Sequence, residues 1–204
     1  MDVGAILGES WRIYVRDIVV LVIATLVAGL LTIVTIGILG GAMYAGLYLM
    51  VIERLRDGTA PRVGDVFDCM DRWLQLFGTT LALVILIAIG LVLFVVPGVY
   101  MIVIWAFVLP LMAEKRLNFS AARAASKTLV GGAGFWTVFV VLLVLTIVTE
   151  VASSVIGFVL NPFHLYPIGG LVSLLTTPFS IIGTTVVYFR LDGRGDVVER
   201  AVTK

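Results

Sequence analysis

The sequence has very few of the residues from which metal centres and covalent catalysts are built. Its 204 residues include one cysteine, Cys69, and one histidine, His164. One cysteine excludes a disulfide within the chain, and one of each excludes a metal centre made of histidine and cysteine ligands. The sequence also contains no nucleotide-binding motif and no pair of carboxylates placed for acid–base catalysis. We therefore predict that the protein is not an enzyme and carries no cofactor.

Charged residues are also scarce. They make up 13% of the chain, whereas roughly a quarter of the residues in a soluble domain are charged. Apolar residues make up 61%, and the mean hydropathy is +1.15. These values predict a single integral membrane domain over residues 1–204, with a polar segment at 191–204. The apolar run after Arg16 is far longer than the core of a secretory signal, so we expect the first span to be retained.

Long uncharged runs predict transmembrane helices in pairs. Residues 18–52 carry no charge, and as one helix these 35 residues would be about 52 Å long, against a hydrocarbon core of roughly 30 Å. Two helices with a turn between them fit better. A second pair is predicted in 73–113, broken at Pro97-Gly98 because proline cannot continue a helix. The predicted spans are 18–36 and 40–54, the two limbs of 73–113 (the second being 98–113), and 135–159 and 168–190.

A short amphipathic segment precedes each predicted hairpin. These segments are residues 3–17, 63–77 and 115–127. In the second, apolar residues recur at helical spacing from Val63 to Phe77, with aspartates on the opposite side. Such a pattern is typical of a helix that lies in the membrane interface. The predicted fold is therefore all-α: a polytopic bundle of six transmembrane helices in three hairpins, each preceded by an amphipathic interfacial helix.

The regular order of these elements suggests an internal repeat. The repeat units would be residues 3–58, 59–114 and 115–190. An alternative explanation is that any six-span protein with alternating loop lengths looks periodic. The sequence does not choose between the two.

The distribution of basic residues predicts the orientation. All 14 lysines and arginines lie in the N-terminal segment, the 53–72 loop, the 114–127 loop or the C-terminal segment. Positive charge favours the cytoplasmic side, so these four segments are predicted to be cytoplasmic. The chain is then a multi-pass protein of the cell (plasma) membrane with both termini inside.

Several short motifs resemble those of a known family. They are Pro97-Gly98-Val99-Tyr100, Trp105, Leu109-Pro110-Leu111, Glu114, Ala121-Ala122, Ser126 and Phe135-Trp136. In this arrangement the chain resembles the membrane domain that accompanies some glycerophosphoryl diester phosphodiesterases, and related six-helix membrane proteins. The catalytic chemistry of that family belongs to a separate soluble domain with acidic and histidine metal ligands. The resemblance therefore implies a fold and a topology, and no activity.

Glu150 is the only ionisable residue deep within a predicted span. Such residues usually face a bundle interior or a transport pathway, so Glu150 is a candidate proton or cation site. On the same helical face lie Thr146, Thr149 and Ser153, and a hydroxyl stripe follows the last helix through Ser173, Thr176, Thr177, Ser180 and Thr184. The alternatives are that Glu150 is protonated or reaches the interface, and that the hydroxyls mediate helix packing. The candidate polar site is Glu150, Thr146, Thr149, Ser153, Thr177 and Ser180.

The remaining polar residues suggest contacts at the membrane surface. Candidate contacts to lipid head groups are Lys115, Arg116, Arg123 and Lys127. Small residues on the second helix, including Gly41 and Gly46, predict close packing within the bundle or between two copies. The first function predicted is thus a non-enzymatic protein that associates with membrane lipids, with itself or with another membrane protein. The alternative is a small transporter or channel that uses Glu150 and the hydroxyl-lined last helix. Nucleic acid is not an expected partner.

Overall fold

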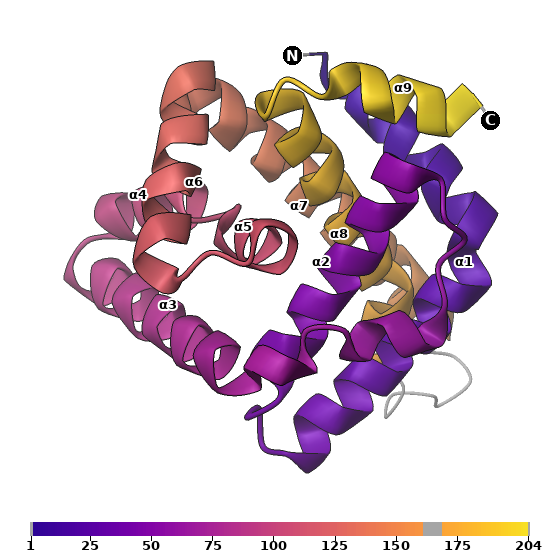
Figure 1. Cartoon of the computed structure of the whole chain (residues 1–204), viewed down its shortest axis with the longest axis horizontal. Helices are drawn as coiled ribbons and strands as arrows, with labels where there is room; N and C mark the ends of the chain where they lie inside the picture. Colours follow the sequence, from indigo (N-terminus) through magenta and orange to yellow (C-terminus); the bar gives the residue numbers. More distant parts are fainter. Residues whose placement is uncertain (1, 161–168, 204) are drawn as a thin grey trace.

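The computed structural model describes residues 2–160 and 169–203, which form helices and connecting turns with no strand among them (Figure 1). The all-α class is therefore confirmed. The turn predicted at 161–167, with His164, lies outside the described residues. The elements are α1 (Val3–Val34), α2 (Gly40–Asp57), two 3-10 turns η1 (Val63–Phe67) and η2 (Met70–Arg72), α3 (Trp73–Leu93), α4 (Val95–Ile104), α5 (Val108–Lys115), α6 (Phe119–Ala133), α7 (Phe135–Leu160), α8 (Gly169–Leu191) and α9 (Gly195–Thr203).

Five helical segments are long and apolar enough to cross a membrane. They are Val3–Val34, Val63–Leu93, Val95–Lys115, Phe135–Phe158 and Leu174–Leu191. The predicted span 40–54 forms α2 but is not among them, because α2 has 18 residues and four charged residues in its last five. Most of α2 is buried, and it contacts α1, α3, α5, α8 and α9. It is the central helix of the bundle (Figure 1).

The first amphipathic segment is not a separate helix. Residues 3–17 continue into the first span as the single helix α1, which has a kink at Asp17 (φ −111°, ψ 16°). Ile6 and Tyr14 of this segment are buried and Arg12 and Arg16 are exposed, as expected of an amphipathic helix, but two residues depart from that pattern. Glu9 is buried because it forms an ion pair with Arg190 of α8 (2.6 Å), whereas Trp11 is 58% exposed.

The second amphipathic segment, 63–77, is not one α-helix but two 3-10 turns leading into α3. The Asp65 carboxylate accepts a hydrogen bond from the backbone N–H of Arg62 (2.8 Å), which fixes a short local turn that competes with an α-helix. Val66 is fully buried, and its carbonyl lies directly over Gly46 of α2. Phe67 remains 41% exposed. The close contact with Gly46 shows that this glycine serves packing within the chain.

The second hairpin turns three residues earlier than predicted. The break between α3 and α4 is the single extended residue Phe94 (φ −156°, ψ 133°), and Pro97 lies in the first turn of α4. Proline is tolerated there because the first N–H groups of a helix have no intrahelical partner. A Cβ on Gly98 would lie 2.5 Å from the Leu91 side chain, so Gly98 allows α3 and α4 to pack closely.

The predicted limb 98–113 is interrupted between α4 and α5. Ser126 of α6 is fully buried at this break. Its Oγ donates a hydrogen bond to the carbonyl of Ile104 (2.7 Å) and accepts one from the N–H of Phe107 (3.3 Å). The Ser126 hydroxyl thus provides hydrogen bonds to a backbone carbonyl at the end of α4 and to a backbone N–H just before α5. The predicted third surface segment, 115–127, is largely helical as α6, which Asn118 caps at its start.

The polar C-terminal segment contains a helix that was not predicted. Residues Gly195–Thr203 form α9, which packs against α1, α2 and α8 and lies near the N-terminus (Figure 1). Val198 is fully buried in this contact. The polar composition of 191–204 obscured a short amphipathic helix with apolar residues at Val197, Val198 and Ala201. The structure leaves the threefold repeat a prediction.

Candidate intramembrane polar site

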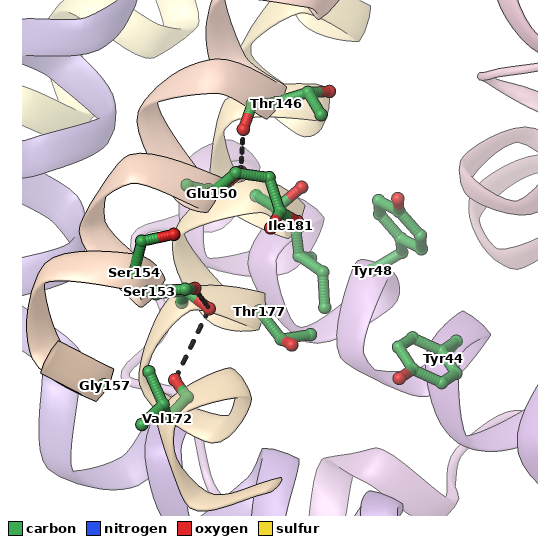
Figure 2. A pocket seen from close by; sticks show the side chains of 13 residues that line it. Tyr44, Tyr48, Thr146, Glu150, Ser153, Ser154, Gly157, Val172, Thr177 and Ile181 are labelled. Carbon is green, nitrogen blue, oxygen red and sulfur yellow. Dashed lines mark hydrogen bonds between the residues drawn. The ribbon is translucent and has the colours of Figure 1, made fainter. Parts of the chain in front are cut away.

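A polar cavity of about 570 Å³ lies between α2, α7 and α8 (Figure 2). It is lined by all six residues of the predicted polar site, Glu150, Thr146, Thr149, Ser153, Thr177 and Ser180. Thr176 of the hydroxyl stripe also lines it, whereas Thr184 does not, and the side chain of Ser173 lies outside the described residues. The structure therefore brings the candidate residues from the two helices to one place.

Helical spacing explains how α7 and α8 contribute to the cavity. On α7, Thr146, Glu150 and Ser153 follow one another at intervals of four and three residues and so share one face. On α8, Thr177 and Ser180 do the same. The opposite face of α7 carries apolar residues that line a separate apolar groove of about 380 Å³ between α7, α8 and α1. The helix pair thus has a polar face and an apolar face.

Some of the lining hydroxyls have partners inside the protein. Thr146 and Thr149 each donate to the carbonyl four residues earlier, at 2.9 Å. Ser153 donates to Thr176 across the interface of α7 and α8 (3.0 Å). These three hydroxyls fit the packing role that was the alternative interpretation of the stripe.

Four other polar side chains face the cavity without such partners. Glu150 and Ser154 are exposed, and Thr177 and Ser180 are half-buried. Within residues 2–160 and 169–203 the structure gives none of these four side chains a hydrogen bond or an ion pair. The cavity therefore presents a carboxylate and several hydroxyls to whatever occupies it.

Two tyrosines of α2 form the other wall of the cavity. Tyr44 and Tyr48 lie one helical turn apart and are seen across the cavity from Glu150 in Figure 2. The sequence analysis did not assign them to the site. Their spacing of four residues placed them on one face of the predicted second helix, but nothing local indicated which helix that face would meet. Ser154 was missed as well, although it is adjacent to Ser153.

No family model, curated protein or solved structure matches the chain. The resemblance to the membrane domain of glycerophosphoryl diester phosphodiesterases thus remains a prediction from the sequence motifs. The function has to be argued from the site itself. In the described residues, no three histidine, cysteine, aspartate or glutamate side chains are grouped so that they could hold a metal ion.

Most of the predicted contacts to lipid head groups have partners within the protein. Lys115 forms an ion pair with Asp192 (3.1 Å), and Arg116 forms one with Asp71 (3.1 Å). The guanidinium of Arg123 lies over the ring of Trp105, 5.2 Å from its centroid. Lys127 is exposed. Three of the four basic side chains are therefore already engaged.

A buried ion pair joins α5 to the segment that follows α8. Arg194 binds both carboxylate oxygens of Glu114, at 2.6 and 2.9 Å, and the Tyr188 hydroxyl donates to the same carboxylate. The Glu114 side chain is only 7% exposed. The hydrogen bonds to Glu114 raise the pKa of Arg194 above its ordinary value, so the guanidinium stays charged. Both oxygens of the Glu114 carboxylate are hydrogen-bonded within the protein, so this ion pair serves structure.

Proposed function

We propose that the chain is a small membrane transporter whose solute site is the polar cavity between α2, α7 and α8. The observation that carries this proposal is the position of Glu150, a carboxylate without an internal partner in a cavity lined largely by hydroxyls. Glu150 is fifteen residues beyond the start of α7, about 22 Å along the helix. A hydrocarbon core is roughly 30 Å thick, so this distance supports a position within the membrane. A charge at that depth is costly unless it faces water or a solute.

We also propose that α2 completes six spans in three hairpins, with both termini in the cytoplasm. Ion pairs support this topology because they join the four polar segments to one another. Glu9 pairs with Arg190, Asp17 with Arg54, Asp71 with Arg116, and Lys115 with Asp192. Segments that contact through side chains lie at the same end of the bundle. The distribution of basic residues favours the cytoplasmic side for this end.

Association with lipid or with a partner protein is less well supported. That function was predicted from the basic residues of the surface segments. Lys115, Arg116 and Arg123 already make contacts within the chain, although Lys115 and Arg116 remain exposed at the surface, and Lys127 is exposed as well. The cavity, in contrast, gathers the residues predicted for the alternative function. The geometry therefore favours transport.

The proposal predicts that the cavity is reached by water and solutes from both sides of the membrane. In a Cys69→Ala background, Ser154→Cys is expected to react with a membrane-impermeant maleimide, because a thiol reacts as the thiolate and needs water to ionise. Val155→Cys is the matched control. Val155 is the next residue on α7 and is also exposed, at 57%, but it does not line the cavity. We expect it to face lipid and react at least tenfold more slowly.

Labelling is done separately from the outer and the inner side, in oriented membrane vesicles. Reaction of Ser154→Cys from both sides is the result expected of a transporter. Reaction from one side only would overturn transport and leave a binding site. Equal rates for Ser154→Cys and Val155→Cys would show that the cavity is not a hydrated site within the membrane.

A further inference from the structure

We infer that the solute of the cavity is an organic ammonium ion, an inference that rests on the transport function proposed above. Three properties of the lining lead to this class: its charge, its size and its aromatic wall. Each excludes a different kind of solute.

The charge of the lining excludes anions. Among the described residues that line the cavity, Glu150 is the one carboxylic acid, and there is no lysine, arginine or histidine. An anion would lose its hydration and gain no opposite charge, and it would meet the carboxylate as well. A cation gains an ion pair with Glu150, and its remaining polar groups can exchange water for the hydroxyls of Ser154, Thr177 and Ser180.

The size of the cavity fits an organic molecule better than a bare metal ion. A volume of about 570 Å³ lies in the range of pockets that hold small organic ligands. Calcium and magnesium need six or more oxygen atoms converging at about 2.0 to 2.6 Å. Here the single carboxylate and the hydroxyls are distributed over three helices around an open space.

The aromatic wall favours an ammonium group over a neutral polar solute. Tyr44 and Tyr48 lie opposite the helix that carries Glu150 (Figure 2). Tyrosine rings attract cations through their π-electrons, most strongly those with weakly hydrated alkyl substituents. An ammonium ion between the carboxylate and the rings would contact both at once. A neutral solute would use only the hydroxyls.

Binding to the purified protein in lipid nanodiscs tests this inference with choline as the probe. The comparison compound is 3,3-dimethylbutan-1-ol, which has the shape of choline with carbon in place of the charged nitrogen. Calorimetry is expected to show choline binding at least tenfold more tightly than the alcohol. Glu150→Gln is expected to lower the affinity for choline at least tenfold and to leave the affinity for the alcohol unchanged. Tyr44→Leu is expected to lower the affinity for choline by about threefold to tenfold.

A charge-matched variant separates the site from the general surface charge. Asp196→Asn also removes one negative charge, but Asp196 is exposed and lies on α9 outside the cavity. Its choline affinity is expected to equal that of the wild type. Equal affinity for choline and the alcohol, or no effect of Glu150→Gln, would overturn the ammonium assignment. So would the absence of binding by both compounds.

Choline binding and the transport function are tested separately, because the labelling of Ser154→Cys does not depend on choline. If Ser154→Cys reacts from both sides and choline does not bind, the transporter stands and its solute class is wrong. If Ser154→Cys does not react, the proposed function itself fails.

Discussion

Replacement of Arg194 by alanine is expected to destabilise the protein by about 3 kcal/mol, because it leaves the carboxylate of Glu114 buried without a counter-ion. The wild-type guanidinium binds both oxygens of that carboxylate, whose side chain is 7% exposed. The Tyr188 hydroxyl would remain as its one donor. The free energy of unfolding is measured by titration with sodium dodecyl sulfate in mixed micelles, with the buried thiol of Cys69 as a reporter of unfolding.

Two comparisons isolate the buried charge as the cause. Arg200→Ala breaks an ion pair in which both side chains are 69% exposed, and its effect is expected to stay below about 1 kcal/mol. In the double variant with Glu114→Gln, part of the lost stability is expected to return, because no unpaired charge remains. Equal losses for Arg194→Ala and Arg200→Ala would contradict this account.

Gly46→Ala is expected to cost about 3 kcal/mol or more, although it adds a single methyl group to a helix. A Cβ at this position would lie 2.0 Å from the carbonyl oxygen of Val66 and 2.7 Å from its carbonyl carbon. Both are backbone atoms, so no side-chain rotation relieves the contact. The helix α2 or the turn η1 would have to move. The loss in the free energy of unfolding is measured by the same titration with sodium dodecyl sulfate.

Gly78→Ala is the matched control, and its expected effect on stability has the opposite sign. Gly78 lies in α3, and no atom lies within 4 Å of the position of its missing Cβ. Alanine there is expected to stabilise the protein by about 0.5 to 1 kcal/mol, because it reduces the conformational freedom of the unfolded chain. If both variants were equally stable, the contact between α2 and η1 would not depend on the absence of a side chain.

The sequence predicted the helices well and their interruptions poorly. The predicted spans 135–159 and 168–190 agree with α7 and α8 to within one residue at each end. A long run with a single charge indicated the pair, and Arg190 marked where it ends. Pro97 is the strongest local break signal in the second hairpin, but a proline in the first turn of a helix costs little. The break fell instead at Phe94, where the close contact of Gly98 with Leu91 fixes the turn. That contact belongs to tertiary packing.

The candidate site was predictable along each helix but not across the bundle. Periodicity placed Glu150, Ser153 and Thr146 on one face, and the structure confirms that they line one cavity. Tyr44 and Tyr48 were not predicted as part of the site, because the whole fold determines which helix lies opposite the polar face of α7 and α8. The ion pairs of the basic residues could not be predicted for the same reason: Lys115 meets Asp192, which is 77 positions away in the chain.

The ion pair between Glu9 and Arg190 has a consequence for how the protein is made. Its partners are separated by 181 positions, and Tyr14 donates to a carbonyl 161 positions later. At a synthesis rate of roughly 5 to 20 residues per second, the first helix waits on the order of 10 to 40 seconds for the last. During that interval the carboxylate of Glu9 has no partner on α8. Assembly of the bundle is therefore completed only when the final span leaves the ribosome, and a chain stalled before that point holds an unfinished core.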